Sequence, residues 1–324
     1  MSDPILAIEN LVIEAGGTRV VDELSLSISP GEVHGLVGES GSGKSLTAAS
    51  IVGLLPLGPK VTGGEISFSG RSLLAADDDE LRLVRGSKIG FVFQDPSSSL
   101  NPTKRIWPQV AESPMIHKGI PAKQGRALAT DLLGKVGVPS PEMRSGSYPH
   151  QLSGGMRQRA AIAAALSSEP RLLIADEPTT ALDVTVQAQI LDLLDDKVRT
   201  HHLAVLLITH DLGVAARLCD SLTILYRGRV LESGPAEAVF GNPQSPYTRM
   251  LLSAVPTLDD TASGSETSGD RGLSRVPQVG PTGCRFSARC EFWRDACSAD
   301  EPTLTIRASG QLARCFATDQ EGWV

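Results

Sequence analysis

The sequence predicts an α/β protein built around a parallel β-sheet. Three short apolar runs, at residues 33–37, 171–175 and 203–208, have the length and composition of buried strands. Helical patterns over residues 155–168 and 184–199 precede the second and third runs. Because strands that alternate with helices favour parallel pairing, we expect one sheet with helices packed against it.

Further segments are predicted around this core. Residues 5–13 and 24–28 alternate apolar and polar side chains, as half-buried antiparallel strands do. A helical pattern at 122–136, together with the one at 155–168, predicts a helical insertion between the early and late strands. The stretch 257–283 is rich in Ser, Gly, Thr, Asp and Pro and predicts a flexible linker.

The composition is that of an ordinary globular protein, with 41% hydrophobic and 21% charged residues. A formal net charge of −7 argues against a nucleic-acid partner, which usually requires a basic surplus. No apolar run approaches the roughly 18 residues that cross a bilayer, and the start of the chain lacks the pattern of a secretory signal. We therefore expect a cytoplasmic protein that acts at a membrane only through partners.

A glycine-rich loop after the first apolar run is the strongest functional signal. Residues 38–45 read Gly-Glu-Ser-Gly-Ser-Gly-Lys-Ser and fit the pattern G-x-x-x-x-G-K-S, between a strand and a helix expected from about Gly43 to Leu55. The glycines let successive N–H groups point at phosphate oxygens, and the helix start adds positive charge. Lys44 is expected to reach the β- and γ-phosphates, and Ser45 to ligate Mg²⁺. The predicted ATP contacts from this segment are Ser40, Gly41, Ser42, Gly43, Lys44, Ser45 and Leu46.

Two carboxylates follow the second apolar run. Asp176 and Glu177 end this strand at the sheet edge where α/β proteins bind ligands. We predict that Asp176 holds Mg²⁺ through water and that Glu177 polarises the attacking water as a general base. With the glycine-rich loop, this pair predicts a P-loop NTPase.

A third motif narrows the class. Residues 152–159, Leu-Ser-Gly-Gly-Met-Arg-Gln-Arg, resemble the L-S-G-G-Q signature of ABC transporter ATPases and lie just before a predicted helix. In that family the signature faces the ATP held by the opposite subunit, so that two ATPs are sandwiched between two subunits. Asp183 matches the D-loop position, which also lies across the dimer. The resemblance implies contacts to the opposite ATP from Ser153, Gly154, Gly155 and Asp183.

Two further positions match the family in order. Gln94 lies at the Q-loop glutamine, which implies contact with ATP, Mg²⁺ and a membrane subunit. His210 matches the switch histidine that contacts the γ-phosphate. The resemblance thus implies Mg²⁺ ligation by Ser45, Gln94 and Asp176 and catalysis by Glu177 and His210.

One position departs from the family pattern. Ala15 stands where an aromatic residue often stacks on adenine. We therefore expect a weaker adenine contact, compensated by aliphatic neighbours such as Val21.

Two finer features resemble the peptide and nickel importer branch of this family. They are Phe-Gln-Asp-Pro-Ser-Ser-Ser-Leu-Asn-Pro at 93–102 and Asn-Pro-Gln-Ser-Pro-Tyr-Thr-Arg-Met-Leu-Leu at 242–252. The resemblance implies an ATPase subunit that powers import of di- or oligopeptides by ATP-driven dimerisation with a second, non-identical ATPase. Two transmembrane permease subunits and an external substrate-binding protein complete such importers. The ATPase is peripheral, on the cytoplasmic face of the membrane, and its cargo (peptides, nickel or glutathione) stays open.

The resemblance also divides the chain. The ABC ATPase core, with a parallel sheet and an antiparallel β subdomain, is expected at 1–94 and 166–245, and the helical signature subdomain at 95–165. A linker and C-terminal extension follow at 246–283, and a Cys-rich tail at 284–324.

The four tail cysteines, Cys284, Cys290, Cys297 and Cys315, suggest a metal site. Their spacing is wider than the Cys-x2–4-Cys pairs of zinc sites and fits four thiolates on an Fe–S cluster better. The tail also resembles the C-terminal segment of peptide-importer ATPases, some of which carry a 4Fe-4S cluster. Zinc, or four unliganded thiols, are the alternatives.

Two other functions are alternatives: an ABC ATPase that acts on ribosomes or DNA, and a redox or metal sensor. ABC ATPases that act on ribosomes usually carry two cassettes, and those that act on DNA carry long coiled coils, neither of which this chain has room for. In a redox or metal sensor, the tail would be primary and the ATPase regulatory.

Overall fold

The structure, a computed structural model, describes residues 3–95, 99–180, 182–254, 283–307 and 310–318. Almost all of the predicted linker, residues 257–282, lies outside the described residues. So do residues 96–98 of the stretch 93–102, and the end of the Cys-rich tail from residue 319.

An eight-stranded sheet forms the centre of the molecule, in the order β11-β12-β10-β9-β3-β8-β7-β6. Strands β9, β3, β8, β7 and β6 pair in parallel, while β10, β11 and β12 pair antiparallel at one end. This confirms the predicted α/β fold, and the three apolar runs lie within one residue of β3, β7 and β8. The strand bounds are β3 (Val33–Val37), β6 (Ile89–Val92), β7 (Leu172–Asp176), β8 (Ala204–Thr209), β9 (Ser221–Tyr226), β10 (Arg229–Pro235), β11 (Thr305–Ile306) and β12 (Leu312–Ala313).

A four-stranded antiparallel sheet packs beside it, in the order β2-β1-β4-β5. Its strands are β1 (Leu6–Ala15), β2 (Thr18–Ile28), β4 (Lys60–Phe68) and β5 (Arg71–Ser72). The pairing of Leu6 with Ile28 and of Ile8 with Leu26 turns the apolar side chains of both strands into the core. The predicted antiparallel strands are confirmed and are longer than the alternation indicated.

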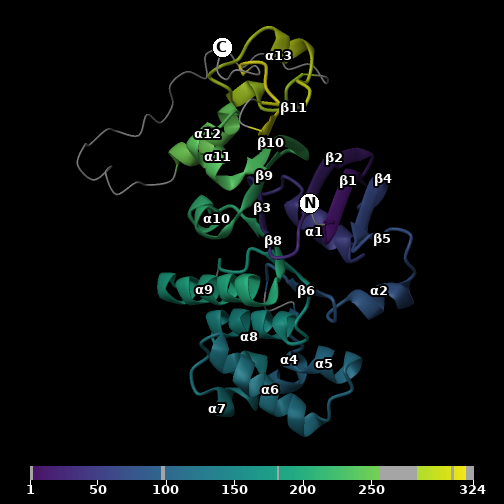
Figure 1. Cartoon of the computed structure of the whole chain (residues 1–324), viewed down its shortest axis with the longest axis vertical. Helices are drawn as coiled ribbons and strands as arrows, with labels where there is room; N and C mark the ends of the chain where they lie inside the picture. Colours follow the sequence, from purple (N-terminus) through teal and green to yellow (C-terminus); the bar gives the residue numbers. More distant parts are fainter. Residues whose placement is uncertain (1–2, 96–98, 181, 255–282, 308–309, 319–324) are drawn as a thin grey trace, which may run out of the picture.

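Helices α4 to α8 lie between β6 and β7 in the chain and gather at one end of the molecule (Figure 1). The helices are α1 (Lys44–Ile51), α2 (Asp78–Val84), α4 (Ile106–Val110), α5 (Glu112–His117), α6 (Ala122–Lys135), α7 (Pro141–Ser145), α8 (Gly154–Leu166), α9 (Val184–His201), α10 (Leu212–Leu218), α11 (Ala236–Gly241), α12 (Pro246–Ser253) and α13 (Ala296–Ala299). Helix α1 ends four residues before the predicted Leu55. Gly53, at φ +63°, and Pro56 both stop a helix there.

The central strands are buried on both faces, which explains their unbroken apolar sequence. Along β7 and β8, alternate side chains such as Leu173 and Val205 join the core with the helices α8 and α9. Their neighbours Ile174 and Leu206 join a second core with α1 and the antiparallel sheet. The parallel sheet is therefore the middle layer, between helices on one face and the antiparallel sheet on the other.

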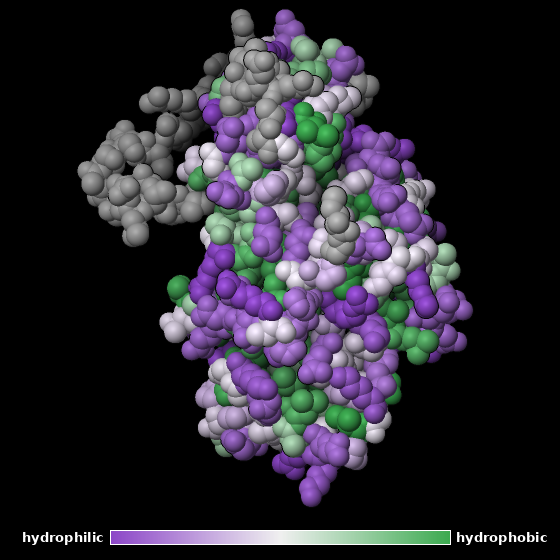
Figure 2. Space-filling model, viewed as in Figure 1, coloured by the Kyte–Doolittle hydropathy of each residue, from purple (hydrophilic) through white to green (hydrophobic). Residues whose placement is uncertain are grey.

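The face shown in Figure 2 is mostly hydrophilic, with apolar side chains at scattered places. Among the described residues, every helix is too short or too polar to cross a bilayer.

The tail, defined here as residues 283–307 and 310–318, is built onto the β10 end of the large sheet (Figure 1). Its strand β12 pairs with β10, Ala313 opposite Glu232. The Glu232 side chain is fully buried and accepts hydrogen bonds from the backbone N–H groups of Gln244 (2.8 Å) and Ser245 (3.0 Å). Nε2 of the tail residue Gln311 donates to the same carboxylate at 3.0 Å. Burial raises the pKa of Glu232 to about 7 in spite of these donors.

This raised pKa predicts a pH-dependent stability. Between the ordinary value of 4.5 and the folded-state pKa of about 7, the folded chain keeps a proton that the unfolded chain releases. The free energy of unfolding should therefore fall as the pH rises through this window, by up to about 3 kcal/mol. Glu232→Gln does not titrate and lacks this decline. Urea unfolding of both proteins at pH 5 and pH 8 measures it, and equal slopes with pH would contradict the prediction.

Candidate nucleotide-binding site

The glycine-rich loop connects β3 to α1, as predicted. Gly43 caps α1 with φ 105° and ψ 0°, a conformation that favours glycine. A Cβ on Gly43 would lie 2.8 Å from the Val20 carbonyl oxygen, and one on Gly38 would lie 2.1 Å from that of Leu225. The loop thus packs tightly against two neighbouring strands. Ser40, Gly41 and Ser45 are exposed, Ser42, Gly43 and Lys44 are buried, and Leu46 packs against the core.

Lys44 lies inside this loop. Its ammonium donates to the carbonyl oxygens of Gly38 (2.7 Å) and Glu39 (2.8 Å). Burial lowers the pKa of Lys44, and the charges of Glu177 and Asp176 oppose this shift. Lys44, the only cation of residues 38–45, therefore faces the two carboxylates at the end of β7, Asp176 and Glu177.

Asp176 has the properties of a cation ligand. Its side chain is buried, and burial raises its pKa, while a hydrogen bond from Ser45 opposes the shift. The oxygen Oδ1 is buried and has no hydrogen-bond partner among the residues that the structure describes. Because a buried carboxylate oxygen without a partner is costly, the pair Asp176 and Ser45 fits a hard cation such as Mg²⁺.

Glu177 contacts two of the predicted site residues, Gln94 and His210, and also Thr180. Its Oε2 accepts hydrogen bonds from Gln94 Nε2 and from Thr180 Oγ1, both at 3.1 Å. Its Oε1 lies 3.0 Å from His210 Nδ1. Burial favours the neutral carboxyl group, but the hydrogen bonds from His210, Thr180 and Gln94 outweigh it and hold the pKa of Glu177 below its usual value. Glu177 is thus an ionised carboxylate at neutral pH, as a general base must be.

The residues expected to contact the opposite ATP lie at the starts of α8 and α9 and not in the loop of residues 38–45. Ser153 caps α8, and its Oγ accepts from the Met156 N–H at 3.3 Å. Asp183 caps α9 in the same way and is followed by Val184, whose side chain is 84% exposed. Both caps are exposed, and α8 lies in the helical end of the molecule, away from α1 (Figure 1).

Sequence reasoning missed two contributors and misplaced one. Thr180 donates a hydrogen bond to the Glu177 carboxylate. Its position three residues after Glu177 was the only sign of this contact in the sequence. Gln158 in the signature stretch is buried and donates to the Pro178 carbonyl oxygen at 2.9 Å, so it ties α8 to the loop after Glu177. Val21 was expected to support adenine beside Ala15, but this is wrong because Val21 is fully buried in the core.

The four tail cysteines line one small pocket with Phe286, Phe292 and Phe316. Burial raises the pKa of Cys284 to about 11 and of Cys290 to about 12, and the neighbouring thiols add to both shifts. In the described part of the chain, no three His, Cys, Asp or Glu side chains are arranged to hold a metal ion. The four thiols therefore line one pocket, but among the described residues they are not arranged to bind a single metal ion.

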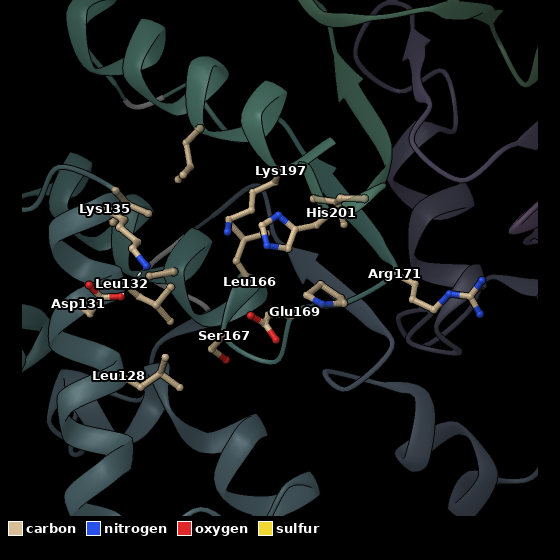
Figure 3. Close-up of a pocket in the computed structure, with 15 residues that line it drawn as sticks. Leu128, Asp131, Leu132, Lys135, Leu166, Ser167, Glu169, Arg171, Lys197 and His201 are labelled. Carbon is tan, nitrogen blue, oxygen red and sulfur yellow. Dashed lines mark ion pairs between the residues drawn. The ribbon is translucent and has the colours of Figure 1, made fainter. Parts of the chain in front are cut away.

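A separate cleft of about 260 Å³ lies where α6 and α8 meet α9 (Figure 3). Leu128, Leu132 and Leu166 form its apolar wall, and Lys197 and His201 extend over it. None of the residues predicted to contact ATP lines it. This cleft is therefore separate from the predicted nucleotide site.

The tight packing of Gly43 predicts a severe effect of one methyl group. Gly43→Ala should destabilise the nucleotide-free chain by about 2 kcal/mol or more, since the new Cβ meets a backbone oxygen and also disfavours the positive φ. Gly41→Ala is the matched control, because Gly41 also has a positive φ (+78°) but no atom within 4 Å of its Cβ position. Urea unfolding compares them, and equal losses would show that the Gly43 contact costs nothing.

Comparison with known proteins agrees with this geometry. The model of the ABC transporter family matches residues 21–180, and that of the oligopeptide/dipeptide transporter C-terminal region matches residues 231–297. A dimeric ATP-binding cassette bound to ADP and Pi is similar in structure, with a TM-score of 0.65 and 30% identity over 71% of this chain and 98% of the cassette. The structure of cbiO1 from Clostridium perfringens, part of an ABC transporter complex, has a TM-score of 0.63 and 29% identity over 74% and 92%.

Similar sequences extend along nearly the whole chain. The dipeptide transport ATP-binding protein DppD of Bacillus subtilis is 43% identical over 98% of this chain and 96% of its own length. DppD of Escherichia coli is 42% identical over 95% and 94%. The oligopeptide transport ATP-binding protein AppD of Bacillus subtilis is 42% identical over 93% and 92%. The chain therefore belongs to the family of ABC transporter ATP-binding proteins, in the branch that carries the oligopeptide/dipeptide transporter C-terminal region.

Proposed function

We propose that this chain hydrolyses ATP to power the import of di- or oligopeptides. The observation that carries the proposal is the Glu177 carboxylate, held by Gln94, Thr180 and His210 beside Lys44. The names of the relatives supply the cargo class, because DppD and AppD are dipeptide and oligopeptide transport proteins.

The roles follow from the chemistry of each group. The loop N–H groups and Lys44 bind the phosphates, with Ser40, Gly41, Ser42, Gly43 and Leu46 around them. Ser45, Asp176 and Gln94 hold Mg²⁺, which neutralises charge on the phosphate oxygens when bound. Glu177 takes a proton from the attacking water. His210 orients Glu177 and lies at the sheet edge where the γ-phosphate is expected.

The second half of each site comes from a partner ATPase subunit in this proposal. Ser153, Gly154, Gly155 and Asp183 are exposed or half-buried at the starts of α8 and α9, and helix starts attract phosphate. ATP binding between two subunits then joins two incomplete sites. The partner is expected to be non-identical, as in the branch that the chain resembles.

Membrane partners complete the proposed transporter. An apolar groove beside Gln94 is lined by Leu54, Phe91, Phe93 and Leu100, and two of these, Leu54 and Phe93, are more than a third exposed. We infer that one of two permease subunits docks here at the cytoplasmic face of the membrane, and that an external binding protein delivers the peptide. Nucleic acid has no place in this function.

We also infer that Cys284, Cys290, Cys297 and Cys315 hold a 4Fe-4S cluster. Four soft thiol ligands around one pocket with aromatic walls support a cluster. A cluster would also favour the thiolate forms, against the burial that raises their pKa values.

Glu177→Gln tests the assignment of the base. The variant keeps the shape of the site but cannot accept a proton, so kcat should fall by about 100-fold or more, while ATP affinity is retained. The matched control, Glu237→Gln, changes an exposed glutamate of α11. ATP turnover and nucleotide binding of the assembled transporter measure both effects. Turnover by Glu177→Gln at the wild-type level would refute the role.

Anaerobic purification tests the cluster. The wild-type chain should carry about four irons and four acid-labile sulfides with a visible absorbance, and Cys290→Ser should lose most of them. Metal analysis reports zinc at the same time. A chain free of iron, or one that carries a single zinc, would rule the cluster out.

A further inference from the structure

The tail touches the phosphate-binding loop directly. Arg289 forms a fork on the Glu39 side chain, with Nη1 2.8 Å from Oε2 and Nη2 2.9 Å from Oε1. Glu39 is the second residue of the loop, and 250 positions separate it from Arg289. Paired hydrogen bonds between a guanidinium and a carboxylate are the strongest and most directional of side-chain ion pairs.

Arg289 is itself held in place. Its guanidinium lies over the rings of Tyr226, at 5.9 Å, and Phe286, at 5.8 Å. These rings pack with Tyr247, with centroids 4.7 to 5.3 Å apart. Because Tyr247 and Phe286 are buried, the platform under Arg289 is part of the core rather than of a loose surface.

The same aromatic cluster also contacts the loop backbone through Tyr247. The N–H of Glu39 donates to the Tyr247 hydroxyl at 3.0 Å, while the Glu39 carbonyl oxygen accepts from Lys44 at 2.8 Å. Three groups of one residue thus connect outward to the tail and to α12, and inward to the phosphate-binding lysine. The position of Lys44 depends on where Glu39 is held.

We propose that Arg289 is a positioning residue of the ATP site, through which the C-terminal tail sets the conformation and charge of the phosphate-binding loop. The inference rests on the proposed ATP site. Arg289 offsets the negative charge of Glu39, which would otherwise repel the phosphates that enter the loop. It touches no part of the Glu177 cluster, so its effect is on nucleotide binding and not on the proton transfer.

Arg289→Ala should therefore raise the KM for ATP about fivefold, with kcat within twofold, as expected for loss of a partly exposed but paired ion contact. Arg289→Lys restores the charge without the fork and should give an intermediate KM. In a Glu39→Gln background, Arg289→Ala should raise the KM for ATP by less than half as much as it does in the wild-type background. The reason is that the Glu39 substitution already removes the ion pair.

Arg285→Ala is the matched control. Arg285 also ties the tail to the core, through Asp22 and the Arg227 carbonyl oxygen, but makes no contact with residues 38–45. The measurement is steady-state ATP turnover of the complete transporter. A wild-type KM for Arg289→Ala, or an equal rise for Arg285→Ala, overturns the inference. A wild-type transporter without ATP turnover would instead refute the proposed function.

Discussion

The in-register pairing of four parallel strands holds the nucleotide site together. Val37 lies opposite Thr209, Ile208 opposite Asp176, and Ala175 opposite Val92. The segments that follow these strand ends, which carry the phosphate loop, Glu177, His210 and Gln94, therefore emerge at one edge of the sheet. Since side chains alternate between faces, a slip of one residue in any pair would exchange the two cores and separate the site.

Glu177 shows how this edge holds a residue under strain. Its φ of +48° is unusual for a residue other than glycine and costs about 1–3 kcal/mol. The Glu177 N–H donates to the Ile208 carbonyl oxygen at 2.9 Å, and three side chains contact its carboxylate. These bonds offset the strain and fix the position of the carboxylate. Contacts from the sheet edge thus hold the proposed base in position.

The fold and most of the site could be predicted because their signals are local. A buried parallel strand is an unbroken apolar run, and the phosphate loop needs glycines at fixed spacing, so β3, β7 and β8 and residues 38–45 were found from short windows. Contacts between distant segments leave no such signal. The Arg289–Glu39 pair and the burial of Val21 depend on which strands and tail residues become neighbours, and these were missed. Thr180 and Gln158 lie within motifs, but only the folded geometry reveals what they hold.

The two groups of residues that are predicted to contact ATP lie on different elements, and this has an energetic consequence. The first N–H groups of α8 have no partners within the helix, and the Ser153 side chain satisfies that of Met156. A phosphate bound at the start of α8 would accept hydrogen bonds from these N–H groups and would lie at the positive end of the helix. The phosphate-binding loop of one chain alone does not provide these interactions. Nucleotide binding free energy is then fully realised only when two subunits close. Since the tail contacts the phosphate-binding loop through Arg289, it acts on the half-site that belongs to the sheet, not on the one at the start of α8.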